Sequence, residues 1–468
     1  MPILLNSMVE GGAHDVPLSV TLLFTGVLVA MITCLALEEK LHAKKSVIVG
    51  LFAGLSLLLG AAFGLLPFGP VNVGGHDLPI PVYIPGIDWN VIAIILGSSL
   101  FVDVTSKSGL FTWIAIKLTK ASGGDPVRLL WFYGLMTVVF SAVLNNVTAM
   151  IIVGSLTAVS LSKLGRRDKL LGFLLVEGLL TNIGGLLTLI SSVPNIIVGT
   201  EAGISFASFF MKASPYVVVA TAATIWLGAR VFGITRLSSV EEKVDARRQV
   251  EGFDENDGIE SRFFFGFGAT MLLIFIIVIA TASILPWIRD LGLGYVALAF
   301  GMIMLVRFKA VADRFYQSLD WDLLAFFAAL FVVINVMEHA HVLNLIGSGL
   351  TRVIELGDLV GTGLFLFLSA IASSVTDNIP LAAMLAKILG AHPTIGTDPD
   401  SPFWWSVIFG ANLGGNLTPI GSASTLVAVT IIHKEKLEMS FAGFVKVALP
   451  FAAVHLVLAA AYVLLFLR

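Results

Sequence analysis

Apolar runs of about 20 residues recur along the whole chain, and they constrain its fold more than any other feature. Residues 16–37, 263–285 and 447–467 are three such runs, each almost free of charge. A helix of this length can cross about 30 Å of hydrocarbon. Charged residues make up only 13% of the chain, about half of what soluble domains carry. The sequence therefore predicts an all-α polytopic membrane protein.

Composition argues against several other classes of protein. Alternating segments of about ten residues, as in a membrane β-barrel, are not the pattern here. The net charge of −3, without a basic cluster, gives no reason to expect a nucleic-acid partner. A single cysteine, Cys34, cannot form an intrachain disulfide or a multi-thiolate metal site. We expect no enzyme activity, no cofactor and no bound metal, because the sequence carries no nucleotide-binding or metal motif.

The distribution of Lys and Arg predicts the topology, since cytoplasmic loops are enriched in these residues. Residues 1–15 and 67–86 contain none, whereas 38–45 contain three. We expect both termini outside, in a plasma or bacterial inner membrane, with the first apolar run retained as a span because no basic segment precedes it. The expected units are N-terminal helices (1–86), a first half (87–233), a flexible cytoplasmic linker (234–262), further helices (263–318) and a second half (319–468).

Three motifs recur in order between the two halves. Asp88-Trp89 returns 232 residues later as Asp320-Trp321, and "LNNVTAM" (144–150) returns at the same spacing as "TDNIPLA" (376–382). "TNIGGLLTLISSVPN" (181–195) returns 230 residues later as "ANLGGNLTPIGSAST" (411–425). The charge pattern starts the first repeat outside and the second inside. Two inverted-topology repeats are typical of secondary transporters with alternating access.

Each half is predicted to contain a hairpin, re-entrant or fully spanning, and a helix broken at an Asn-Gly-Gly motif. Exposed backbone groups at such breaks are tolerated in a membrane where they line a cavity or are buried, and half-helix N-termini attract anions. Single Asn or Gly pairs can also be turn or packing residues. The predicted substrate-binding residues are Asn145, Asn146, Thr148, Asn182, Gly184, Gly185, Thr188, Ser192, Asn195, Asn378, Asn412, Gly414, Gly415, Thr418 and Ser422.

Three carboxylates at membrane depth are candidates for proton coupling, since intramembrane charges are usually functional. Asp377 lies at the tip of the second hairpin and Glu177 precedes the first break on an apolar helix. Asp103 lies four residues before Lys107, so it could instead form a structural ion pair on one helix face.

The same elements resemble the ion transporter superfamily, and specifically its ArsB/NhaD branch of arsenite exporters and P-protein-like permeases. The resemblance runs from about residue 87 to the C-terminus and is carried by "NIGGLLTLISSVPNIIVG", "SSVTDNIPLAAM" and "GANLGGNLTPIGSAS". It implies two halves of about five helices, with substrate held between hairpin tips and broken helices. Relatives often have a "GDPPN" element where this chain has "SSVPN" (191–195), so ligands from the first half are expected to be neutral.

The leading functional prediction is proton-coupled efflux of arsenite or antimonite, an uncharged trihydroxide suited to amide and hydroxyl groups. The first alternative is a sodium/proton antiporter. Carboxylate or other anion transport comes third, because no Lys or Arg appears at the expected site. An ion channel is also considered. The expected partners are the small inorganic substrate, protons, the lipid bilayer and, as an option, a second copy of the chain.

Overall fold

The computed structural model describes residues 16–73 and 75–467. Within them the chain forms 21 α-helices, two short 3-10 helices and one two-stranded hairpin. Eleven helical segments of the described chain are long and apolar enough to cross a membrane by length and composition. This confirms the prediction of a polytopic α-helical protein. The prediction that residues 1–15 lie on the outer side of the membrane concerns residues that are not among those described.

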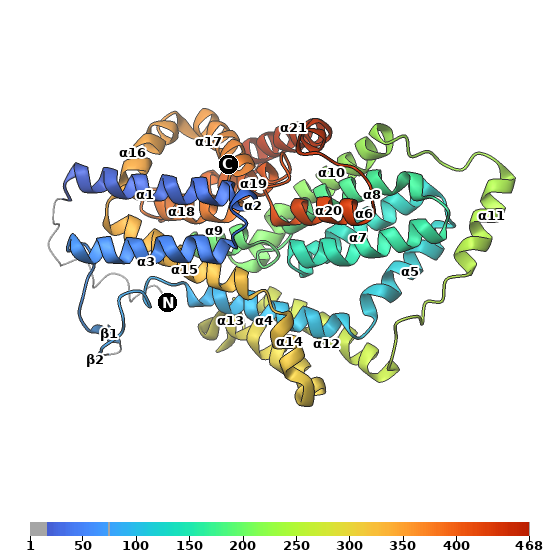
Figure 1. Ribbon diagram of the computed structural model, residues 1–468, viewed down its shortest axis with the longest axis horizontal. Coiled ribbons are helices and arrows are strands. Elements are labelled where there is room, and N and C mark those ends of the chain that lie inside the picture. Colours follow the sequence, from blue (N-terminus) through green and yellow to red (C-terminus); the bar gives the residue numbers. More distant parts are fainter. Residues whose placement is uncertain (1–15, 74, 468) are drawn as a thin grey trace.

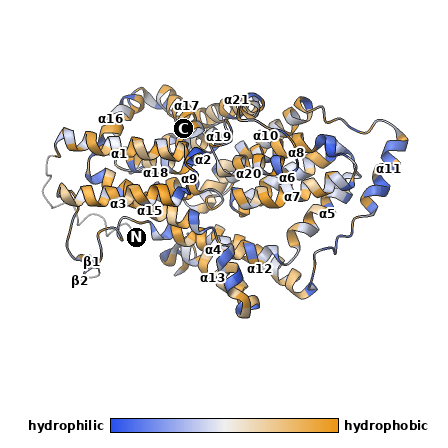
Figure 2. Ribbon diagram, in the orientation of Figure 1, coloured by the Kyte–Doolittle hydropathy of each residue, from blue (hydrophilic) through white to orange (hydrophobic). Residues whose placement is uncertain are grey.

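The N-terminal part is a pair of apolar helices followed by a small hairpin. Its elements are α1 (Leu18–Ala36), α2 (Glu38–Leu41), α3 (Lys45–Ala62), β1 (Val71–Val73) and β2 (His76–Leu78). Helices α1 and α3 run side by side (Figure 1), and both are largely hydrophobic (Figure 2). Strands β1 and β2 pair antiparallel, with Val71 opposite Leu78.

The first half follows as a series of seven helices. They are α4 (Trp89–Ser106), α5 (Leu110–Ser122), α6 (Pro126–Val143), α7 (Asn146–Lys163), α8 (Leu170–Gly185), α9 (Val193–Glu201) and α10 (Phe206–Val231), with a 3-10 turn at Arg167–Lys169. Asp88 caps α4 by accepting from the backbone N–H groups of Asn90 and Val91, which satisfies donors that a helix N-terminus leaves free. Helices α6 and α7 form the predicted hairpin.

The segment between the halves, for which the sequence predicted a flexible linker, is partly helical. Residues 240–251 form α11 (Val240–Glu251). A capping box explains this helix, because Ser239 accepts from the N–H of Glu242 while the Glu242 carboxylate accepts from the N–H of Ser239. Helix α11 is hydrophilic (Figure 2) and is followed by α12 (Arg262–Thr281), α13 (Ile288–Leu305), a 3-10 segment (Val306–Val311) and α14 (Ala312–Ser318).

The second half has the same order of seven helices as the first. They are α15 (Trp321–His339), α16 (Val342–Ile354), α17 (Gly357–Val375), α18 (Asn378–Gly390), α19 (Pro402–Gly414), α20 (Ala423–Lys434) and α21 (Phe441–Phe466). Local details recur as well. Asp320 caps α15 as Asp88 caps α4. The indole N–H groups of Trp89 and Trp321 each donate to the carbonyl oxygen five residues before.

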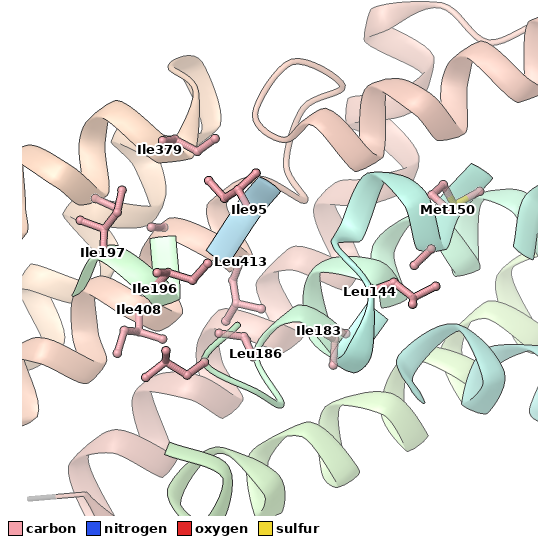
Figure 3. Packing of buried hydrophobic residues seen from close by; sticks show 14 of the residues in the cluster. Ile95, Leu144, Met150, Ile183, Leu186, Ile196, Ile197, Ile379, Ile408 and Leu413 are labelled. Carbon is pink, nitrogen blue, oxygen red and sulfur yellow. The ribbon is translucent and has the colours of Figure 1, made fainter. Parts of the chain in front are cut away.

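The core of the molecule lies where the hairpin tips meet the broken helices. Residues 172–185 of α8 and 403–414 of α19 are buried without exception. Figure 3 shows apolar side chains around this region, with Leu144 from the first tip, Ile379 from the second, and Ile183 and Leu413 from the two broken helices. These contacts hold the polar segments described next in a fixed arrangement.

Candidate functional site

Two buried breaks interrupt the central helices. Helix α8 ends at Gly185 and α9 begins at Val193, while α19 ends at Gly414 and α20 begins at Ala423. Pro194, at the start of α9, has no backbone N–H and favours the beginning of a helix over its interior. Residues 186–192 and 415–422 therefore carry backbone groups without helical partners, deep inside the protein.

Amide and hydroxyl side chains bind the two breaks to each other. The Ser192 hydroxyl donates to Asn412 Oδ1 over 2.7 Å, and the Ser422 hydroxyl donates to Asn182 Oδ1 over 2.9 Å. Asn412 Nδ2 donates to Asn195 Oδ1 over 2.8 Å. All five side chains are 5% exposed or less. These predicted site residues thus form two hydrogen-bonded groups, Ser192–Asn412–Asn195 and Ser422–Asn182, and each group joins the two halves.

Each hairpin is fixed to the break of its own half by the same pair of hydrogen bonds. In the first half, Ser141 donates to the carbonyl of Thr181 and Thr188 donates to the carbonyl of Ala142. In the second half, Ser373 donates to the carbonyl of Ala411 and Thr418 to that of Ser374. The four partners are related by the offsets of 230 and 232 residues found in the sequence. The two halves therefore build the same local contact.

The predicted glycines allow the close packing of hairpin against broken helix. A Cβ at Gly184 would lie 2.7 Å from the backbone of Val138 in α6, and one at Gly414 would collide with the backbone of Ala370 in α17. A Cβ at Gly185 would lie 2.5 Å from Asn146 Oδ1, and one at Gly415 would lie 2.8 Å from Ser422 Cβ. In the described structure these glycines serve packing, which was the alternative interpretation of the Asn-Gly-Gly motifs.

The N-termini of α9 and α20 have no side-chain cap. Ser192 and Ser422 occupy the capping positions, but their hydroxyls donate to asparagines of the opposite half. Within the described chain, the backbone N–H groups of residues 193, 195 and 423–425 have no acceptor. Free N–H groups and the helix dipole favour a negative group at such a position. The centre therefore contains two N-termini, one from each half, suited to an anion.

The two hairpin tips differ in charge and in partners. Asn145 and Asp377 cap α7 and α18 by accepting from the N–H groups of Thr148 and Ile379. Asp377 Oδ2 also lies 2.5 Å from Lys45 Nζ at the start of α3. The side chain of Asn378 is 6% exposed and forms no hydrogen bond with any described residue. This amide lies beside a Lys–Asp pair, without a partner among the described residues.

Glu177 and Asp103 lie in different surroundings. Glu177 on α8 is fully buried, with Oε1 accepting from the Thr157 hydroxyl over 2.6 Å and Oε2 without a partner among the described residues. Asp103 accepts from the Ser318 hydroxyl over 2.8 Å. The ion pair considered between Asp103 and Lys107 is absent from those in the described residues, because Lys107 is exposed and lies beyond the last residue of α4.

A cavity of about 520 Å³ lies at the far ends of α9 and α18. Its lining includes Asp88, Glu338, Asn335 and the pair Glu201–Lys387, whose charged atoms are 3.1 Å apart. Helix α9 has nine residues, so Glu201 at the cavity and the first residue of the helix are separated by about 12 Å at 1.5 Å per residue.

Three residues of the site were missed from the sequence. Asn416 accepts from Asn182 Nδ2 over 2.8 Å, and Ser424 donates to Asn182 Oδ1 over 3.1 Å. Both lie inside the quoted second motif, and Asn416 stands where the first half has an apolar Leu186, so its polarity was a usable signal. Lys45 was visible only as a charge at the start of an apolar run; its partner is 332 residues away.

Comparison with known proteins gives the family. The citrate transporter family model matches residues 7–410. An uncharacterized transporter of Mycobacterium tuberculosis is 31% identical, over 81% of this chain and 86% of that one. The human P protein is 24% identical, over 88% of this chain and 57% of that protein. The predicted likeness to P-protein-type permeases is thus supported, while membership of the ArsB/NhaD branch stays a prediction.

Solved structures agree on the fold. The Alcanivorax borkumensis YdaH transporter superposes with a TM-score of 0.58 at 14% identity, over 95% of this chain and 97% of that one. Neisseria gonorrhoeae MtrF, described as one of a class of antimetabolite efflux pumps, gives 0.56 at 14% identity over 91% of this chain and 95% of its own. The protein is therefore a multi-pass secondary transporter, and it belongs to the citrate transporter family.

Proposed function

We propose that the protein is a secondary active carrier of a small carboxylate anion of the citrate class, coupled to protons and working by alternating access. The observation that carries this proposal is the pair of uncapped helix N-termini, α9 held to Asn412 of α19 and α20 held to Asn182 of α8. Each N-terminus offers free N–H donors and the positive end of a helix dipole to one carboxylate. The family name points to the same class of solute.

Lys45 removes the reason for which the sequence ranked carboxylate transport third. No Lys or Arg was expected near the site, yet Lys45 reaches the tip of the second hairpin. The remaining predicted ligands are neutral amides and hydroxyls, which donate hydrogen bonds to carboxylate oxygens as readily as to a trihydroxide. Because Lys45 is paired with Asp377 and Glu38, the preference for an anionic solute rests on the two helix N-termini.

We further propose that residues 87–233 and 319–468 are inverted repeats that move relative to each other during transport. Support comes from the common helix order and from the equivalent pairs Ser141–Thr181 and Ser373–Ala411. The polar groups of the two breaks satisfy one another in the described structure, so solute entry requires some of these hydrogen bonds to open. The cavity near Glu201 and Lys387 is the proposed approach from the outer side.

Proton coupling is assigned to Glu177 ahead of Asp377. Lys45 compensates the charge of Asp377, whereas Glu177 has only a hydroxyl partner among the described residues. Because burying an unpaired carboxylate is costly, movement of α7 against α8 would change the proton affinity of Glu177 through Thr157. The proposed setting is a bacterial inner membrane with both termini outside.

The test is uptake by purified protein in proteoliposomes under an imposed pH gradient. Labelled citrate, succinate, arsenite, antimonite and Na⁺ are supplied in parallel. The proposal expects saturable carboxylate movement that the proton gradient stimulates, and no transport of arsenite or Na⁺. Arsenite or antimonite movement without carboxylate movement would restore efflux of the uncharged trihydroxide, which the neutral amides and hydroxyls favour, and would refute this proposal. Sodium/proton exchange alone would refute it too.

A further inference from the structure

A second cavity, of about 650 Å³, lies away from the central site, between the linker and the first hairpin. Its walls are the end of α5, the start of α6, the segment at 236–237 and helix α11. Five basic residues line it, with only two acidic ones. The lining charges are Lys120, Arg128, Arg236, Lys243 and Arg247, with Asp125 and Glu251.

Most of the positive charge in this cavity has no counter-charge. Lys120 pairs with Glu255. Asp125 is engaged by backbone donors on both oxygens, from Arg128 N over 2.9 Å and from Leu237 N over 3.1 Å. The other four basic side chains form no ion pair with any described residue. Several like charges around one concavity raise the local concentration of anions.

The cavity is built by tight docking of the linker and not by loose surface chains. Ala246 and Val250 of α11 are buried, and a Cβ at Gly124 would lie 2.7 Å from that of Ala246. Leu237 is also buried. The two walls that carry the basic residues are thus held together by apolar contacts and by the Asp125–Leu237 hydrogen bond.

We propose that this cavity binds a phosphate-bearing anion, which connects the linker helix α11 to the α6 arm of the first hairpin. Arginine guanidinium groups match phosphate oxygens in geometry, and lysines add charge. The volume falls within the range of small-molecule sites, about 300–1,000 Å³. A soluble phosphorylated metabolite and an anionic lipid headgroup share this chemistry, and the test separates them.

The experiment measures binding to the full-length protein in nanodiscs of neutral phosphatidylcholine, so transport does not enter the readout. Inorganic pyrophosphate and ATP are the soluble probes. The lipid probe is phosphatidylglycerol, added to the nanodiscs and detected by native mass spectrometry. The variant is Arg247→Glu, and the matched control is Arg248→Glu, a neighbour on α11 that does not line the cavity.

We expect Arg247→Glu to weaken binding of one probe class by about tenfold or more, the effect of losing a charge-assisted hydrogen bond. Arg248→Glu should change it less than about twofold because its charge lies outside the cavity. Loss confined to pyrophosphate and ATP would identify a soluble ligand, and loss confined to phosphatidylglycerol would identify a lipid headgroup. Equal effects of the two variants, or binding of neither probe class, would overturn the proposal.

Discussion

The two hairpin tips have the same backbone design but opposite electrostatic settings. At the first tip, Asn146 accepts from Ser141 over 2.8 Å and donates to Asn182 over 3.2 Å, so it is held by neutral groups of its own half. At the second tip, Asp377 is held by Lys45 of α3, which belongs to neither half. Asn378 there has no hydrogen bond with the described residues.

This difference assigns different tasks to two related elements. Neutral hydrogen bonds fix the first tip to its broken helix, as expected of a structural support. The second tip keeps the equivalent hydrogen bonds to its broken helix, adds one ion pair and leaves an amide without a partner, so its charge can respond to a bound solute. The second hairpin is therefore expected to control transport, and the first to stabilise the site.

The largest expected effect comes from removing the charge of the second tip. Asp377→Asn keeps the cap of α18 but removes the shorter ion pair of Lys45, which then has only Glu38 at 3.8 Å as an acidic partner. We expect citrate uptake in proteoliposomes to fall below about one-tenth. The double variant Lys45→Met/Asp377→Asn should recover thermal stability without recovering uptake. Full uptake by Asp377→Asn would remove the ion pair from the mechanism.

Substitution of the neutral amides at the two tips should affect different quantities, substrate affinity at the second tip and protein stability at the first. Asn378→Ala removes an uncommitted group, so we expect KM for citrate to rise about tenfold with little change in Tm. Asn146→Ala removes two hydrogen bonds, so we expect a loss of about 1–3 kcal/mol in stability and a smaller change in KM. Uptake kinetics and thermal unfolding in detergent measure both. A larger change in KM for Asn146→Ala and a larger loss of stability for Asn378→Ala would reverse the roles assigned to the two hairpins.

Substitution of Glu177 tests whether proton coupling resides in the first half, although the tip of the first hairpin is neutral. Glu177→Gln keeps an oxygen to accept from Thr157 but cannot exchange a proton. We expect uptake driven by the pH gradient to fall by about 10²-fold, the lower end of what positioned proton-transfer groups contribute, while citrate/citrate exchange continues. Thr157→Val is the control for the hydrogen bond alone. Unchanged stimulation by the gradient would exclude Glu177 as the coupling group.

The smallest effect concerns the linker docked on the first half. Hydrogen bonds from Lys117 and Lys120 lower the pKa of the Glu255 carboxyl from 4.5 to about 2. A lowered pKa means that the contact contributes fully above pH 4.5 and is lost as the pH falls through about 2. Hydrogen exchange of residues 253–259 should therefore be equally protected at pH 5 and pH 8, after correction for intrinsic rates. Loss of protection at pH 5 would contradict the assignment, and Glu255→Gln should raise exchange only slightly.

Local sequence patterns predicted the elements that depend on nearby residues. The apolar runs and the breaks after Gly185 and Gly414 follow from short-range rules, whereas Asp88 and Asp320 were noticed only as a repeated motif and not as helix caps. The α11 capping box at Ser239 and Glu242 was equally local and was overlooked. Contacts between segments far apart in the sequence could not be predicted from such local patterns. Lys45–Asp377 and Asn182–Asn416 form only once the halves pack together, so no periodicity in the sequence encodes them.

The most direct test of an anion held at two helix N-termini places a fixed charge there. Ala423 is the first residue of α20. An aspartate there would place a negative charge at the positive end of the helix dipole and compete with a substrate carboxylate, whereas an asparagine of equal size would add no charge. The measurement is the initial rate of labelled citrate uptake by wild-type, Ala423→Asn and Ala423→Asp protein in proteoliposomes. We expect uptake by Ala423→Asp to be slower than by Ala423→Asn by about tenfold or more, with both variants folded. Equal rates for the two variants would contradict it.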